Sequence, residues 1–178
     1  MRSPRLSVCQ SERIGKVALP REVLVVAAVS SSFLLHGVGF CAICIALWLW
    51  GVPIHLLALP LAFLTYLQLF VLALGFALTF AAIQVFVRDL SQVLVQILQL
   101  WMFASPIFYA REFLPERFRG WLDFNPVTHY VETFRAILLD TGPVGLLDQG
   151  ISLLVAIVAL AIGFSVFRRL SPHFEDFL

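Results

Sequence analysis

Residues 23–87 read VLVVAAVSSSFLLHGVGFCAICIALWLWGVPIHLLALPLAFLTYLQLFVLALGFALTFAAIQVFV and contain no Asp, Glu, Lys or Arg. A transmembrane helix needs roughly 20 apolar residues to cross a hydrocarbon core of about 30 Å. This run of sixty-five residues is too long for one crossing and suits two. A charge at the bilayer centre costs about 2.5–3.5 kcal/mol on insertion scales. The uncharged run therefore predicts an all-α integral membrane protein.

The composition agrees with a membrane protein and excludes several other classes. Hydrophobic residues make up 61% of the 178 residues and charged residues 13%, against about 25% charged in soluble domains. The net charge of +1 gives no electrostatic basis for binding nucleic acid. Cys41 and Cys44 form a C-x-x-C inside an apolar segment, with no second ligand pair, so we expect packing residues there. No metal site and no cofactor are expected.

Turn signals and charges divide the chain into four predicted spans. Gly51 and Pro53 mark a turn within the long run, and Arg88–Asp89 and Arg168–Arg169 end later runs. We predict a cytoplasmic segment over 1–22 and a membrane domain over 23–178, with spans at about 24–48, 56–83, 90–110 and 149–167 and an outer segment at 111–148.

The distribution of basic residues predicts the orientation in the membrane. Four spans place both termini on one side, and cytoplasmic loops carry the excess of Lys and Arg. Eight basic residues fall on the terminal side and four in the outer segment, namely Arg2, Arg5, Arg13, Lys16, Arg21, Arg88, Arg168 and Arg169 against Arg111, Arg117, Arg119 and Arg135. The sequence thus predicts that both termini are cytoplasmic.

The outer segment carries the pattern of a short amphipathic helix. Asn125 suits an N-cap and Pro126 the first helical position. Apolar residues then recur at helical spacing, at Val127, Tyr130, Val131, Phe134, Ile137 and Leu138, while Thr128, His129, Glu132 and Arg135 take the other face. About thirteen residues are too short to span, so we expect this helix in the membrane interface or dipping part-way into it. Residues 115–124 suit a second such piece, with Phe118, Trp121 and Leu122 on its apolar side.

Polar residues within the predicted spans form stripes. Gln92, Gln96 and Gln99 fall within about 60° of one another on the third span. Unpaired amides are costly in lipid, so this face is expected to meet protein as a hydrogen-bonded helix seam or to line a polar pathway. Trp101 lies on the opposite face and either packs or stacks on a sugar ring. Thr65, Gln68, Gly75 and Thr79 form a weaker stripe on the second span.

Two cytoplasmic elements have two interpretations each. Arg88–Asp89 either ends one helix and caps the next, or contacts a cytoplasmic partner. Residues 16–22 (KVALPRE) either anchor the first span by positive charge or contact the same partner.

Support for catalysis is limited to Asp123, His129 and Glu132, whose spacing an amphipathic helix also explains. The chain contains no H-E-x-x-H, G-x-S-x-G or G-x-x-x-x-G-K-[ST] motif. No acidic residue falls within a predicted span, which argues against a proton- or sodium-coupled carrier. ATP-driven transport would need another polypeptide to bind the nucleotide.

Several separated motifs resemble one known family. They are Arg88–Asp89–Leu90 after a span, Ser105–Pro106–Ile107 ending the next, Asn125–Pro126 in the outer segment, Phe134–Arg135 nine and ten residues on, Pro20–Arg21–Glu22 before the first span, and the tail from Phe167–Arg168–Arg169–Leu170 to Phe174–Glu175–Asp176. In order and spacing they are similar to the second half of ABC-2 type permeases that export polysaccharides such as O-antigen, capsule or teichoic acid chains. The resemblance covers residues 16–178.

The resemblance implies a homodimer of permeases in the plasma (bacterial inner) membrane, served by a separate cytoplasmic ATPase, with a lipid-linked glycan passing between the permeases. By position, it implies ATPase contacts at Lys16, Pro20, Arg21, Glu22, Arg88 and Asp89. The outer helix with Asn125, Pro126, Tyr130, Phe134 and Arg135 would correspond to short helices near the channel exit. Aromatic residues on such a path suit sugar rings.

The family has six spans preceded by an amphipathic helix, so the resemblance also implies a fragment or truncated member that lacks the first two. Residues 1–14 resemble nothing in the family. The alternatives are an ABC-2 permease for a non-glycan substrate, a membrane enzyme that uses the outer carboxylates and His129, and a membrane scaffold without a transport role.

Overall fold

The computed structural model describes residues 21–52, 59–109, 111–139 and 145–176, which contain helices and no β-strand. In chain order the elements are α2 (Arg21–Leu49), α3 (Leu59–Gln84), α4 (Leu90–Ala104), the 3-10 helix η3 (Arg111–Phe113), α5 (Glu116–Asp123), α6 (Pro126–Leu139), α7 (Leu146–Leu170) and the 3-10 helix η4 (Ser171–Asp176). This confirms the expected all-α membrane protein.

Three of these helices are long and apolar enough to cross a bilayer. They are α2, α3 and α7, of 29, 26 and 25 residues. α2 begins at Arg21, inside the segment predicted to be cytoplasmic. It is followed by a turn at Gly51, whose φ of 83° is readily adopted only by glycine. The turn lies at the predicted cut, although residues 53–55 fall outside the described part of the chain.

α4 is shorter than the uncharged run that contains it. The helix has 15 residues, about 22 Å at 1.5 Å per residue, and it ends at Ala104 rather than near Ala110. Ser105 adopts an extended conformation, as is usual before a proline, and Pro106 has no N–H with which to continue the helix. At the other end of the outer segment, α7 begins at Leu146, so Asp148 lies in its first turn rather than in a loop.

The core lies between α3 and α7. The buried residues of α3 follow one face at helical spacing, namely Ala62, Thr65, Gln68, Leu72, Gly75, Leu78 and Ala82. Small residues let the two backbones approach closely around Gly75 and Gly163. Polar residues of the same face pair across the helices: Gln68 Nε2 donates to Gln149 Oε1 (3.3 Å), and Gln149 Nε2 donates to Thr65 Oγ1 (3.2 Å). The polar stripe expected on the second span therefore meets α7.

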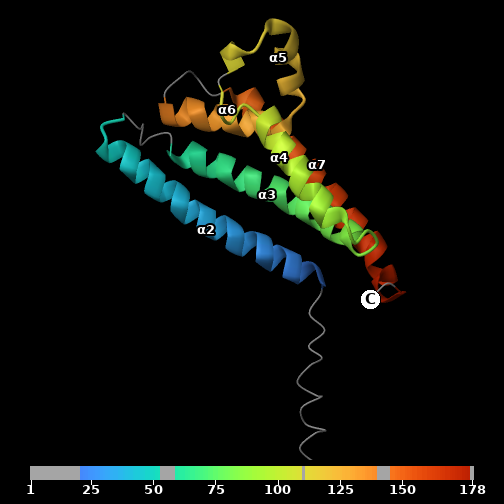
Figure 1. Cartoon of the computed structure of the whole chain (residues 1–178). Helices are drawn as coiled ribbons and strands as arrows, with labels where there is room; N and C mark the ends of the chain where they lie inside the picture. Colours follow the sequence, from blue (N-terminus) through green and yellow to red (C-terminus); the bar gives the residue numbers. More distant parts are fainter. Residues whose placement is uncertain (1–20, 53–58, 110, 140–144, 177–178) are drawn as a thin grey trace, which may run out of the picture.

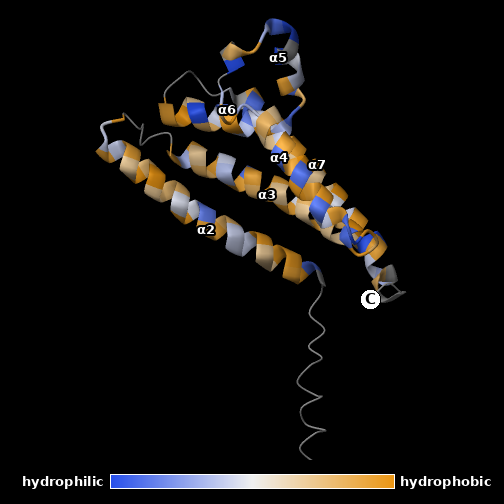
Figure 2. Cartoon of the chain, viewed as in Figure 1, coloured by the Kyte–Doolittle hydropathy of each residue, from blue (hydrophilic) through white to orange (hydrophobic). Residues whose placement is uncertain are grey.

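α2 lies beside α3 and exposes most of its surface (Figure 1). Its contacts include the hydroxyl of Tyr66, which donates to the Phe33 carbonyl, and the Phe33 and Phe70 rings, whose centroids are 5.2 Å apart. Many large apolar side chains of α2 are exposed, among them Leu34, Leu35 and Leu49 at 73% each. Figure 2 shows hydrophobic residues along most of α2 and α3, and hydrophilic residues on α5 and at several positions of α4. Lipid is the solvent that suits the apolar surface.

The connections and short helices lie at two opposite ends of the long helices (Figure 1). The start of α2, the turn between α3 and α4, and η4 lie toward one end, and α5 and α6 lie at the other. α6, which lies within the predicted outer segment, has 14 residues, close to the predicted length of about thirteen. In α5, Leu122 is buried as expected, whereas Trp121 is 77% exposed. The two residues predicted on one apolar side of this piece thus differ in burial within the chain, and its position in the membrane interface stays a prediction.

Candidate functional site

A hydrogen-bonded joint connects the outer end of α4 to the start of α6. The indole Nε1 of Trp101 donates to Asn125 Oδ1 over 2.8 Å, and Asn125 Nδ2 donates to Ser105 Oγ over 2.8 Å. The Ser105 hydroxyl donates in turn to the Trp101 carbonyl at 2.9 Å. Ser105 is 1% exposed, and Trp101 and Asn125 are half-buried, so these bonds are partly shielded from solvent. The three side chains form a closed ring of polar contacts at the point where the chain leaves α4.

Asn125 also caps α6. Its Oδ1 accepts the Val127 N–H at 3.0 Å, and its carbonyl accepts the Thr128 N–H at 3.1 Å. Pro126 stands at the first helical position, where a missing N–H costs nothing. A side chain at an N-cap typically stabilises a helix by about 1 kcal/mol. Asn125 is therefore both the cap predicted from the sequence and the centre of a tertiary contact that the sequence did not indicate.

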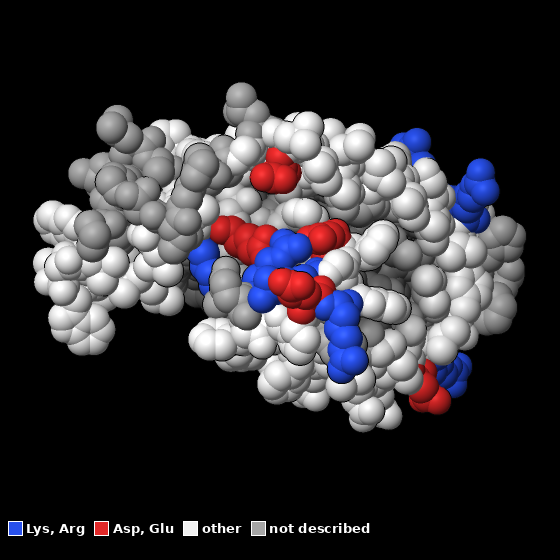
Figure 3. Space-filling view, turned by 90° about the horizontal axis from the view of Figure 1, so that it is seen from above, with Lys and Arg blue, Asp and Glu red and all other residues white. Residues whose placement is uncertain are grey.

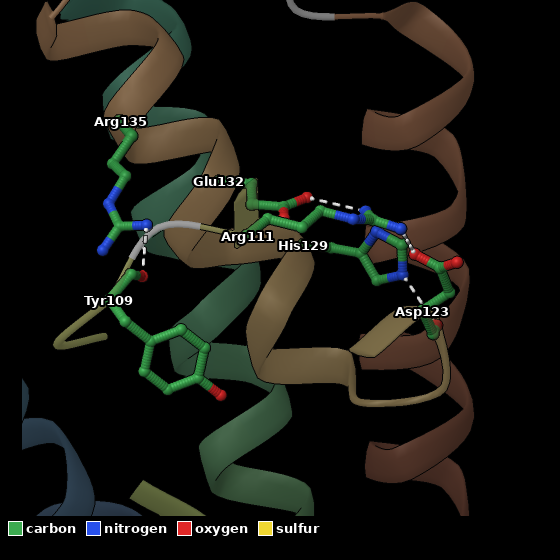
Figure 4. Close-up of polar contacts among 6 residues, drawn as sticks. All are labelled: Tyr109, Arg111, Asp123, His129, Glu132 and Arg135. Atoms are coloured by element: carbon green, nitrogen blue, oxygen red, sulfur yellow. Dashed lines mark hydrogen bonds and ion pairs between the residues drawn. The ribbon is translucent and has the colours of Figure 1, made fainter. Parts of the chain in front are cut away.

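Arg135 fixes the segment between α4 and η3 from the side of α6. Its guanidinium donates from Nη1 to the Tyr109 carbonyl (3.1 Å, Figure 4) and from Nη2 to the Ile107 carbonyl (3.0 Å). These bonds satisfy two backbone carbonyls in a segment without regular structure. Together with the joint at Asn125, they attach both ends of this connection to α6.

α6 is anchored to the core through Tyr130. This side chain is 1% exposed, and its hydroxyl donates to the Ser152 carbonyl of α7 at 2.8 Å. Burial raises the pKa of Tyr130 to about 12. Phe134, one turn further along α6, contacts the Phe40 ring of α2 at a centroid distance of 5.4 Å. Both aromatic residues predicted on the outer helix thus make packing contacts within this chain.

A cluster of charged residues lies beside α6 at the outer end. Arg111 Nη2 contacts Asp123 Oδ1 at 2.5 Å and its Nη1 lies 3.5 Å from Glu132 Oε2, while His129 Nε2 lies 3.1 Å from the Asp123 carbonyl (Figure 4). Figure 3 shows acidic and basic residues gathered at the centre of this end. A cavity of about 280 Å³ adjoins them, lined by Arg111, Asp123, His129, Glu132, Thr133, Ala136 and Asp148.

The geometry of this cluster is that of ion pairing. Arg111 bridges the two carboxylates, so neither is held apart as a free acid or base. Glu132 Oε1 is buried and has no hydrogen-bond partner among the described residues. Within the same residues, no group of three or more His, Cys, Asp or Glu is arranged to hold a metal ion. The ion pairs connect η3 to α5 and α6, and the placement of these groups gives no support for a catalytic use.

The three glutamines of α4 point away from the rest of the chain. Gln92, Gln96 and Gln99 are all exposed. The half-buried residues of α4 are Leu90, Leu94 and Trp101, which lie about 160–200° around the helix from Gln92 at 100° per residue. The amide face is thus directed outward, while Trp101 faces inward and meets the Phe76 ring edge-on at 5.7 Å. Trp101 and the three glutamines thus lie on opposite faces of α4, the arrangement that their helical spacing predicts.

The elements predicted to be cytoplasmic are only partly described. Lys16 and Pro20 lie outside the described residues, Arg21 is the first residue of α2, and Glu22 is in its first turn. Arg88 and Asp89 form an exposed turn, in which Gln84 Nε2 donates to the Arg88 carbonyl at 3.2 Å. Asp89 takes the N-cap position of α4, yet its side chain makes no capping bond. The carboxylate of Asp89 is thus not engaged in capping the helix.

Reasoning from the sequence missed Ser105, Arg111 and the paired Gln68 and Gln149 as contact residues. Ser105 stood in a noted Ser-Pro-Ile motif, but nothing in that motif indicated a partner 20 residues away. Gln68 was noted in a polar stripe, whereas Gln149 stood at the edge of a predicted span, where an amide needs no partner. Long-range pairing of this kind leaves no local signal in one sequence.

Comparisons with known proteins agree with the motifs. Residues 5–139 match the model of a family described as ABC-2 type transporter. The chain is similar to an O-antigen export system permease protein RfbA of Klebsiella pneumoniae, at 23% identity over 185 residues. A second protein of that name and organism is 24% identical over 188 residues. Both alignments cover 96% of this chain and 66% of the relative, so the chain spans just under two thirds of the length of these relatives. No solved structure matches the chain.

Proposed function

The chain belongs to the ABC-2 type transporter family, and on that premise we propose that it is the membrane-spanning permease part of an ATP-driven exporter of lipid-linked polysaccharide. The two relatives carry O-antigen export in their names, which favours O-antigen over the capsule or teichoic acid chains that the motifs also suit. The substrate is a long, hydrated chain of sugars, so its path needs polar groups inside an otherwise apolar domain.

One observation carries this proposal, namely the outward direction of the amide face of α4. Gln92, Gln96 and Gln99 lie within eight residues, a rise of about 10 Å along the helix. Each amide offers both donors and an acceptor, and leaving such groups unpaired in lipid costs several kcal/mol. A water-filled passage with sugar hydroxyls satisfies all three. Alternatively, these amides form hydrogen bonds with another helix in a dry seam. Measuring whether position 96 is accessible to water distinguishes the seam from the passage.

The proposed assembly contains two permeases and a separate ATPase. The 178 residues include no G-x-x-x-x-G-K-[ST] sequence, so ATP hydrolysis is assigned to another subunit. We propose ATPase contacts at Lys16, Pro20, Arg21, Glu22, Arg88 and Asp89, of which Lys16 and Pro20 fall outside the described residues. The start of α2, the α3–α4 turn and η4 lie toward the same end of the long helices (Figure 1). We assign this end to the cytoplasmic side of a plasma (bacterial inner) membrane because of the excess of basic residues on the predicted terminal side.

Export of a non-glycan substrate is the closest alternative, since the family match alone does not specify the cargo. A membrane enzyme has less support, because the carboxylates of Asp123 and Glu132 both form ion pairs with Arg111. A scaffold would have no use for the outward amide face of α4.

The test is complementation with the whole exporter. A strain that makes its O-antigen but lacks its own export permease receives the gene of this protein together with that of its ATPase. We expect O-antigen on the cell surface, detected by antibody on intact cells, and none when the Walker lysine of the ATPase is replaced. Accumulation of the lipid-linked chain inside cells that contain both proteins at normal levels would contradict the proposal.

A further inference from the structure

The contacts of α4 are concentrated at its outer end. None of its residues is fully buried, so side-chain packing holds its middle only weakly. At the outer end, by contrast, Trp101 and Ser105 are both hydrogen-bonded to Asn125, at 2.8 Å each. A helix held in this way can rotate about its axis unless the contacts at its end prevent it.

The joint contacts one side of α4. Trp101 and Ser105 are four residues apart and therefore lie on the same side of the helix. Trp101 is about 180° from Gln92 at 100° per residue, so the side that meets Asn125 is opposite to the amide face. Because Tyr130 fastens α6 to α7, Asn125 is itself held by the core. The bonds of Asn125 thus set the direction in which the glutamines point.

We propose that Asn125 is a positioning residue for export: it fixes the rotation of α4 so that Gln92, Gln96 and Gln99 face the passage. This proposal rests on the proposed function, since a passage must exist for the amides to face. Asn125 makes no contact with the substrate in this scheme and acts through Trp101 and Ser105.

The chemistry of the joint explains why the residue is asparagine. Oδ1 accepts from both Trp101 and the Val127 N–H, and Nδ2 donates to Ser105. Aspartate at this position keeps both acceptor contacts but has no N–H for Ser105, whose hydroxyl would have to turn away from the Trp101 carbonyl. Alanine loses every side-chain contact. The series Asn, Asp, Ala therefore weakens the joint in steps while Asp preserves the helix cap.

The experiment measures which side of α4 faces water. The whole exporter, with its ATPase and with Cys9, Cys41 and Cys44 replaced by Ala, carries either Gln96→Cys or Ile97→Cys, which lie about 100° apart on the helix. A charged, membrane-impermeant methanethiosulfonate reagent modifies cysteines in contact with water. With the joint intact we expect modification at position 96 to be much faster than at position 97.

Asn125→Ala and Trp101→Phe are expected to lower the ratio of the two modification rates several-fold, and Asn125→Asp to lower it less. Trp101→Phe keeps an aromatic ring, though a smaller one, and removes the donor. Ser165→Ala is the matched control, because it removes a hydrogen bond within α7 (to Ala161, 2.7 Å) that does not involve α4. Export per ATP hydrolysed should fall in Asn125→Ala and Trp101→Phe and not in Ser165→Ala, at equal amounts of folded exporter.

The outcomes separate the two proposals. An unchanged rate ratio in Asn125→Ala and Trp101→Phe, with position 96 reactive in the parent, overturns the positioning role and leaves the passage standing. Failure of position 96 to react in an exporting parent shows that the amides form a dry seam, which overturns the positioning role but not export. Absence of export in the parent overturns the proposed function itself.

Discussion

Gly75 of α3 lies directly against Ala159 of α7, so that a Cβ atom added at Gly75 would stand 2.5 Å from the Ala159 carbonyl carbon. Gly163 lies on the next turn of α7 and meets the backbone at Gly75 in the same way. In lipid, helices gain little from burying apolar surface, and close backbone contact between small residues takes over that role. The α3–α7 pair is therefore the scaffold on which the outer segment rests.

We predict that Gly75→Ala destabilises the protein, because the added methyl group meets backbone atoms that cannot move independently of α7. Overpacking of this kind costs about 1–3 kcal/mol. Thermal unfolding in detergent or nanodiscs should show a lower midpoint. Gly39→Ala is the control, since a Cβ at Gly39 of α2 meets nothing within 4 Å. Equal midpoints for the two variants would show that the helices do not approach as closely as described.

Gln149→Met should destabilise the protein through its buried partners. Methionine has a similar length but cannot bond to Gln68 or Thr65, which are 3% and 1% exposed. An unpaired buried polar group costs about 1–3 kcal/mol. The measurement is again the unfolding midpoint, compared with Gln84→Met, whose amide bond to the Arg88 carbonyl is exposed and replaceable by water. A midpoint for Gln149→Met at or above that of the parent would contradict the pairing.

Tyr130 predicts a loss of stability at alkaline pH. Its pKa is about 12 in the folded protein and about 10 in an unfolded chain. Below pH 10 both states hold the proton and the group has no effect. Between pH 10 and 12 the unfolded chain releases the proton while the folded protein keeps it, so stability falls as the pH rises. We expect Tyr130→Phe to show a smaller fall in unfolding midpoint over this range.

At neutral pH, Tyr130→Phe should be less stable than the parent by about 1 kcal/mol, the usual value of one hydrogen bond, because the Ser152 carbonyl loses its donor. The parent loses about 1.4 kcal/mol for each pH unit above 10 through this group, so the stability curves of the parent and Tyr130→Phe should cross at about pH 11, above which the parent is the less stable of the two. Parallel curves across the whole range would mean that Tyr130 does not titrate with a raised pKa.

Membrane orientation predicts which residues a reagent outside the cell can reach. In the cysteine-free background, Glu116→Cys in the exposed start of α5 should react with an impermeant maleimide on spheroplasts. Arg88→Cys, in the exposed α3–α4 turn, should react only after the membrane is opened. Both should react at similar rates in detergent, which controls for exposure. Reaction of both positions in sealed spheroplasts would contradict the four-span arrangement.

Local sequence patterns predicted the helices, turns and caps that depend on residues close together in the chain. The uncharged run of residues 23–87, the turn at Gly51 and the cap at Asn125 each follow from the chemistry of neighbouring residues, and the structure contains two long helices, a glycine turn and α6 at these places. The sequence placed Trp121 and Leu122 on one apolar side of α5, but only contacts with other elements decided that Leu122 is buried and Trp121 exposed. α4 is short because it ends before Ser105 and Pro106. The prediction of a longer span followed only the absence of charged residues and did not take this proline into account.

What the sequence determined by itself is the solvent: hydrocarbon excludes charge, so an uncharged run of this length has to form helices within a bilayer, and the motifs along it lead to a transporter family. Tertiary structure alone decided which side of each helix faces which neighbour. Trp101, Ser105 and Asn125 come together over 20 and 24 residues of chain, on the side of α4 opposite to its glutamines. Helical periodicity determines how side chains are arranged around the helix axis. The rotation of the helix about that axis is determined only by contacts with residues distant in the sequence.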